Sequence, residues 1–164
     1  MPHWDFRPHG TIVDQETFAG VTELETRQAA RLQYAVSLLT IHWNRHGDVA
    51  DPGDAAAQLA EVVSPVIRST DLVEVGPAAA TVRVLLVGGD SEDLRSIIQR
   101  IIAEVSHYRF DEEPTLVVNI GGSSFPATAA SSRELLLQAD AMAEEARRER
   151  GSSSTYRLCE RSKV

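Results

Sequence analysis

Apolar residues follow two different periods along this chain, and the changes of period predict alternating strands and helices. Tyr34 to Trp43 is an almost continuous apolar run, short enough and rich enough in β-branched residues to be a buried strand. Residues 51–67 then carry apolar side chains at helical spacing, behind a proline at the first helical position. Pro65 lies inside this second pattern. Because an interior proline removes a backbone hydrogen bond, we expect a kink or an early end of that helix.

The middle of the chain predicts a hairpin followed by another helix. Two apolar, β-branched segments, residues 71–75 and 80–87, flank a turn at residues 76–79. Ser91 is a good N-cap for the helix that follows. That helix has the clearest apolar stripe in the sequence, formed by Leu94, Ile97, Ile98, Ile101, Ile102 and Val105.

Three further elements are predicted in the last third of the chain. Residues 115–121 have the composition of a strand that ends at a pair of glycines. Ser131 and Glu134 have the spacing of a capping box, at the start of a long helix that ends near Gly151. Residues 155–158 are expected to form a short last strand at an edge of the sheet.

The N-terminal segment has no regular period. Residues 1–20 contain three aromatic side chains without strand or helix spacing, and we interpret them as an arm that lies over the domain. Thr22 and Glu25 have capping-box spacing and predict the start of a helix that runs to about residue 33. The chain therefore divides into an N-terminal arm, residues 1–20, and one folded domain, residues 21–160.

The order of these elements predicts the fold class. From residue 34 onward they read strand, helix, strand, strand, helix, strand, which is the order of the ferredoxin-like fold. We therefore expect an α+β protein with a βαββαβ palm, in which helices pack around an antiparallel central sheet. The length of 164 residues is sufficient for one domain with a hydrophobic core.

Charge and cysteine content exclude several classes of partner. Twenty-four acidic and sixteen basic side chains give a formal charge of -8, which repels a phosphate backbone, so no long nucleic acid is expected to bind. Cys159 is the only cysteine, which excludes a disulfide framework and a zinc quartet. No apolar run approaches the ~20 residues that cross a bilayer, and the first residues lack the pattern of a secretion signal. Lys163 is the sole lysine and alanine is abundant, a bias that indicates a GC-rich bacterial genome. We expect a cytoplasmic, bacterial protein without a membrane partner.

Four stretches of the sequence resemble the GGDEF family of nucleotidyl cyclases, in matching order and at matching intervals. The most specific is residues 135–142, similar to the late helix of the family, in which an Ala-Asp pair follows a leucine run. Residues 117–122 resemble the Ser-Ile-Gly strand that precedes this helix in the family. Residues 68–73 resemble the Arg-x-x-Asp segment before the hairpin, and residues 99–101 resemble the Arg-Ile pair of the helix after the hairpin. The resemblance covers residues 14–158 and implies a diguanylate cyclase-like domain in signal transduction.

The catalytic features of the family do not match. In active members, the Gly-Gly-Asp/Glu-Glu-Phe turn approaches the guanine nucleotide and supplies a metal ligand. The corresponding residues here are Pro77, Ala78, Ala79, Ala80 and Thr81. The second metal carboxylate of the family lies in an Asp-x-Asp pattern on the first strand, and the best match is Thr40-Ile41-His42, whose hydroxyl and imidazole suit Mg²⁺ poorly. The resemblance therefore implies a degenerate domain that is not an enzyme, with no catalytic residue, metal ion or cofactor.

A nucleotide-binding function is implied instead. Active members of the family bind their product, cyclic di-GMP, at an inhibitory site made by the Arg-x-x-Asp pair and an arginine of the next helix, and the matching residues are Arg68, Asp71 and Arg100. Guanidinium groups suit phosphates and the Hoogsteen edge of guanine, and a carboxylate suits guanine N1 and N2. The same residues can equally be structural, with Arg68 at a helix C-terminus and Asp71 capping a turn.

Two rival functions stay open beside the cyclic di-GMP receptor. One is a protein-protein interaction or dimerisation domain without a nucleotide ligand, in which the fold survives only as a surface for a homodimer or a protein partner. The other is an enzyme with altered chemistry, which the three alanines of the turn disfavour.

Overall fold

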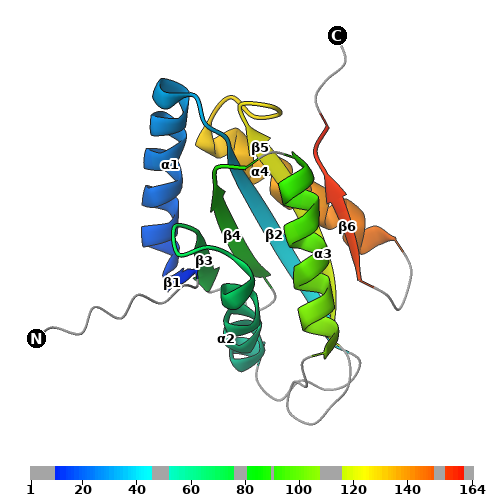
Figure 1. The fold of residues 1–164 in the computed structure, drawn as a ribbon. Helices are drawn as coiled ribbons and strands as arrows, with labels where there is room; N and C mark the ends of the chain where they lie inside the picture. The colour runs from blue at the N-terminus through cyan, green and yellow to red at the C-terminus, as the bar shows by residue number, and fades with distance from the viewer. Residues whose placement is uncertain are drawn as a thin grey trace, which may run out of the picture.

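A computed structural model describes residues 10–45, 52–75, 81–89, 91–107, 116–149 and 154–160, which form a mixed sheet and four α-helices (Figure 1). The strands are β1 (Thr11–Val13), β2 (Val36–Arg45), β3 (Leu72–Val75), β4 (Thr81–Val87), β5 (Leu116–Phe125) and β6 (Thr155–Leu158). The helices are α1 (Gln15–Leu32), α2 (Pro52–Val63), α3 (Ser91–His107) and α4 (Ser132–Arg148), and a 3-10 turn (Ser64–Val66) follows α2. Within these ranges, no helix has both the length and the apolar character that crossing a membrane requires.

The four central strands confirm the ferredoxin-like order. The sheet runs β1-β3-β4-β2-β5-β6, and the pairs β3-β4, β4-β2 and β2-β5 are antiparallel. α2 connects β2 to β3 and α3 connects β4 to β5, so these elements make up the predicted βαββαβ unit. The edge strands β1 and β6 pair in parallel with β3 and β5, and the complete sheet is therefore mixed.

Alternation along β2 divides the hydrophobic core between the two faces of the sheet. The odd-numbered residues from Leu39 to Trp43 belong to the cluster that α2 and α3 cover. Val36 and Leu38 belong to the opposite cluster, which α1 and α4 cover. Figure 1 shows α3 in front of the sheet and α4 behind it. Thr40 continues the series of Leu38, so it lies on the face covered by α4.

The N-terminal helix begins earlier than the sequence predicts. α1 starts at Gln15, where Asp14 is the N-cap and its side chain accepts a hydrogen bond from a first-turn amide. Thr22, the predicted cap, lies inside the helix, and its hydroxyl donates to the backbone oxygen of Phe18. The predicted start at Thr22 is therefore wrong. Residues 10–20 of the predicted arm contribute β1 and the first turns of α1.

Two other boundaries were predicted from proline and glycine residues, and one of the two is correct. α2 ends at Val63 and gives way to the 3-10 turn that contains Pro65, so the predicted early end is confirmed. β5 does not end at the predicted pair of glycines, because it continues to Phe125, which pairs with Val36 at the start of β2. The predicted end of this strand is wrong, and the glycines instead lie inside it.

Candidate functional site

A row of polar side chains crosses the α4 face of the sheet through neighbouring strands. Ladder pairing places Thr40 of β2 opposite Arg83 of β4, and Arg83 opposite Glu74 of β3. Directly opposite residues in antiparallel strands have their Cβ atoms about 5 Å apart, so these three side chains are immediate neighbours. On its other side, Thr40 pairs with Gly121 of β5. The row is therefore polar in its centre and has no side chain at Gly121.

The helix α4 lies directly on this row because Gly121 has no side chain. A Cβ atom at Gly121 would overlap the backbone nitrogen of Ala143 and the backbone oxygen of Ala139. Such a close approach of two backbones requires glycine on one side and favours small residues on the other. It brings Asp140, the neighbour of Ala139 in α4, into hydrogen-bonding distance of the polar row.

Asp140 accepts three hydrogen bonds from the row. Its Oδ1 accepts from Thr40 Oγ1 at 2.6 Å and from Arg83 Nε at 3.2 Å, and its Oδ2 accepts from Arg83 Nη2 at 3.1 Å. A guanidinium that donates to both oxygens of a carboxylate forms a strong and directional ion pair. The remaining nitrogen of the guanidinium, Nη1, lies 3.5 Å from Glu74 Oε1. One cation is therefore shared by two carboxylates.

Burial influences the ionisation of this cluster. The side chain of Glu74 is only 4% exposed, and desolvation raises the pKa of its carboxyl, while Arg83 acts in the opposite direction. Further along β2, His42 Nδ1 lies 3.2 Å from the hydroxyl oxygen of Thr81. Burial lowers the pKa of His42, and the charge of Arg147 adds to this effect. The neutral form of the imidazole is therefore favoured.

The residues present do not fit a magnesium ion. Thr40 and His42 occupy the positions that match the Asp-x-Asp pattern, and both oxygens of Asp140 are already bonded to Thr40 and Arg83. Mg²⁺ requires carboxylate or phosphate oxygens and water in near-octahedral geometry. In the part of the chain that is described, no group of three or more His, Cys, Asp or Glu side chains could hold a metal ion.

Of the five residues that the resemblance matches to the signature turn, the structure describes only the last. Thr81 is the first residue of β4. The other four signature positions lie outside the described residues: Pro77, Ala78, Ala79 and Ala80.

Asp71 is a buried carboxylate that binds backbone amides. The residue is 1% exposed; its Oδ2 accepts from the amide of Arg68 and its Oδ1 from the amide of Val87, both at 2.9 Å. Its own backbone oxygen accepts from the amide of Thr11. Burial raises the pKa of the carboxyl, against the effect of the two amide bonds. This geometry supports the structural, turn-capping role of Asp71.

The structure brings Arg68 and Asp71 together and places Arg100 on a separate element. Arg68 is exposed, and its Nη2 lies close to Gly89, just before α3. Arg100 is exposed within α3. Both guanidinium groups are therefore accessible to an anionic ligand, whereas the carboxylate of Asp71 is not.

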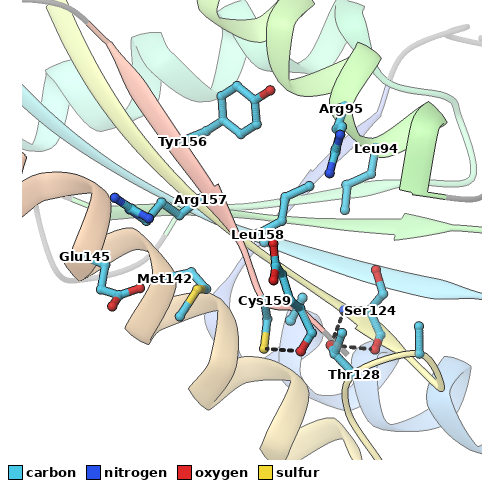
Figure 2. Close-up of a pocket in the computed structure, with 14 residues that line it drawn as sticks. Leu94, Arg95, Ser124, Thr128, Met142, Glu145, Tyr156, Arg157, Leu158 and Cys159 are labelled. Carbon is cyan, nitrogen blue, oxygen red and sulfur yellow. Dashed lines mark hydrogen bonds between the residues drawn. The ribbon is translucent and has the colours of Figure 1, made fainter. Parts of the chain in front are cut away.

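An open groove of about 1170 Å³ follows the edge strand β6. Figure 2 shows Leu94 and Arg95 of α3 on one side of this strand, and Met142 and Glu145 of α4 on the other. Arg68, Asp71 and Arg100 do not line the groove. Because the groove extends around both sides of an edge strand and its charged residues have opposite signs, it does not indicate a site for one class of ligand.

Sequence reasoning does not identify the cluster of Arg83, Glu74 and Asp140. A usable signal exists for two of its members, since each lies alone between apolar neighbours in Leu-Val-Glu-Val and Val-Arg-Val. Opposite charges on the two strands of one predicted hairpin indicate a cross-strand pair. No comparable signal exists for Asp140, because its partner depends on where α4 lies on the sheet.

Comparison with known proteins finds no matching family model and no matching curated protein sequence. Solved structures do match. The GGDEF domain of PA1120 (TpbB or YfiN) from Pseudomonas aeruginosa is 23% identical, with a TM-score of 0.78 over 91% of this chain and 91% of that chain. The active GGEEF domain of a diguanylate cyclase from Vibrio cholerae is 15% identical, with a TM-score of 0.73 over 93% of this chain and 100% of that chain.

A further similar structure was solved with a nucleotide. The GGDEF domain of DgcB from Caulobacter crescentus, in complex with c-di-GMP, is 13% identical, with a TM-score of 0.68 over 95% of this chain and 95% of that chain. At these identities, the likeness concerns the fold. The chain has the fold of the GGDEF domains of diguanylate cyclases.

Proposed function

We propose that this chain is a catalytically inactive regulatory module with the GGDEF-domain fold. The observation that carries the proposal is the hydrogen bond from Thr40, the residue matched to a metal carboxylate of the family, to Asp140, which also pairs with Arg83. Thr40 is fully buried under α4 and uses its hydroxyl to bind Asp140. The polar groups here are bonded to one another, so they serve the packing of α4 and not a reaction.

The chemistry of cyclisation supports this proposal. Transfer of a phosphoryl group needs divalent ions that neutralise charge on the reacting phosphates, held by oxygen ligands with open coordination positions. Thr40 and His42 offer a hydroxyl that is already engaged and a half-buried imidazole. In the sequence, the signature turn adds no carboxylate at residues 77–81.

Incubation of the protein with GTP and Mg²⁺ tests this proposal. We expect no cyclic di-GMP above the level of a protein-free reaction after overnight incubation, measured by liquid chromatography and mass spectrometry. Repeating the reaction with Mn²⁺ and adding an active diguanylate cyclase as a positive control establishes the detection limit. Formation of cyclic di-GMP that depends on protein concentration would contradict the proposal.

We further propose that the module binds cyclic di-GMP through the exposed guanidinium groups of Arg68 and Arg100. Arginine is suited to this ligand, because its planar fork donates paired hydrogen bonds to phosphate oxygens and to the edge of guanine. Asp71 contributes indirectly, because its carboxylate holds the backbone amide of Arg68 in the turn before β3. The similar structure of DgcB in complex with c-di-GMP makes this nucleotide the first ligand to test.

Isothermal titration calorimetry with cyclic di-GMP tests this second step. We expect saturable heat for the wild type and at least a tenfold loss of affinity for Arg68→Ala and for Arg100→Ala, since a charge-assisted hydrogen bond contributes about 1.5–3 kcal/mol. Arg133→Ala removes an exposed arginine from the first turn of α4 and serves as the matched control. Unchanged heat in both Arg68→Ala and Arg100→Ala would contradict the assignment.

The alternative function is a protein-protein interaction or dimerisation domain without a nucleotide ligand. Its support is the exposure of large apolar side chains on two helices, with Leu24 of α1 53% exposed and Leu137 of α4 58% exposed. Such side chains would mark an interaction surface if they belonged to one contiguous apolar patch. A wild type that gives no heat with cyclic di-GMP would favour this alternative.

A further inference from the structure

Arg83 occupies the centre of an interaction that joins three strands and a helix. Its two cross-strand neighbours are Thr40 and Glu74, and its partner on α4, which covers this face of the sheet, is Asp140. Three guanidinium nitrogens are engaged: Nε and Nη2 with the carboxylate of Asp140, and Nη1 with that of Glu74. The group is therefore oriented by its partners on both sides.

Without a cation at this position, the two carboxylates would be unbalanced. Glu74 is nearly inaccessible to solvent, and the negative charge of Asp140 acts to raise its pKa. A buried carboxylate that loses a cationic partner is costly, and it either takes up a proton or binds another cation. The available oxygens include those of two carboxylates, which are ligands that hard divalent ions prefer.

We propose that Arg83 is the resident cation of this site, and that its guanidinium holds Glu74 and Asp140 together so that the face of the sheet needs no divalent ion. The inference deepens the proposed function and rests on it, because it assigns the charge balance of this cluster to a guanidinium in place of a metal ion. The site should respond to divalent ions only when Arg83 is removed.

Thermal unfolding in titrations of CaCl₂ and MgCl₂ tests this inference, with ionic strength held constant by NaCl and EDTA as the metal-free reference. The wild type and Arg83→Lys, which keeps the charge, should have the same midpoint with and without metal. Arg83→Met keeps the length of the side chain and removes the charge. Its midpoint should be lower in EDTA and should rise by about 3 °C or more at saturating metal, because a ligand that binds only the folded state stabilises it.

Two variants keep the test decisive if Arg83→Met folds poorly. Adding Asp140→Asn to Arg83→Met removes one of the two carboxylates and should abolish the response to metal. Asp140→Asn alone keeps Arg83 and should be as indifferent to metal as the wild type. A saturable stabilisation of the wild type by Ca²⁺ or Mg²⁺ would overturn the inference, as would an Arg83→Met protein that millimolar metal neither stabilises nor refolds.

These outcomes are separate from those that test the proposed function. A wild type that makes no cyclic di-GMP but gains stability from metal would leave the proposed function intact and remove the role of Arg83. A wild type that makes cyclic di-GMP would contradict the proposed function itself.

Discussion

Replacing Gly121 with alanine should lower the free energy of unfolding by about 3 kcal/mol, at the upper end of the usual cost of overpacking. The added Cβ would overlap backbone atoms of Ala139 and Ala143, and backbone cannot move aside as a flexible side chain can. The helix α4 would have to shift away from β5, which also separates Asp140 from Thr40. Urea denaturation followed by circular dichroism measures the loss.

Gly20→Ala is the matched control for this substitution. Gly20 lies in α1, where a Cβ would meet no atom within 4 Å. Alanine in a helix interior is more favourable than glycine by up to about 1 kcal/mol, so this variant should be as stable as the wild type or more stable. Equal stability of Gly121→Ala and Gly20→Ala would show that α4 does not lie as close to β5 as described.

Replacing Asp71 with alanine should have an effect of similar size, about 3 kcal/mol, because two backbone amides lose their acceptor inside the protein. These amides belong to Arg68 and Val87, so the change releases the turn before β3 and the end of β4 together. Asp71→Asn retains one acceptor oxygen and should lose less stability than Asp71→Ala. The free energy of unfolding from urea titration measures both.

Asp14→Ala provides the comparison for a carboxylate in an ordinary capping position. Asp14 is the exposed N-cap of α1 and accepts one amide hydrogen bond at 2.8 Å, so its loss should cost about 1 kcal/mol. The difference between the two alanine variants isolates the contribution of burial and of the second amide. If Asp71→Ala unfolds no more easily than Asp14→Ala, then Asp71 is not the structural anchor that its hydrogen bonds indicate.

The central fold can be predicted from the sequence, because the period of the apolar residues identifies each helix and strand locally, and the order of these elements along the chain then identifies the fold. The apolar run of β2 and the stripe of α3 predict a strand and a helix without knowledge of their partners. The predicted start of α1 is wrong, because Thr22 and Glu25 have the spacing of a capping box but lie inside a helix that Asp14 caps. Side-chain spacing cannot distinguish a cap from a threonine whose hydroxyl binds the preceding turn.

The site was less predictable, because its contacts join residues far apart in the chain. Arg83 and Asp140 are separated by 57 positions, and they meet only because Gly121 admits α4 to the sheet. The segment around Arg68 and Asp71 could be singled out by its resemblance to the Arg-x-x-Asp segment of the family. Its burial could not, because the amide of Val87 reaches Asp71 only through the pairing of β3 with β4.

The proposed loss of metal-dependent nucleotide chemistry is tested most directly by the binding of Mn²⁺ in the presence of a non-hydrolysable GTP analogue, followed by electron paramagnetic resonance of the free ion. With Arg83 paired to Asp140 and Glu74, we expect the free Mn²⁺ signal to be the same with and without the protein at every concentration of the analogue. A decrease equivalent to one or more ions per chain, requiring both the protein and the analogue, would contradict the proposed loss of the metal site.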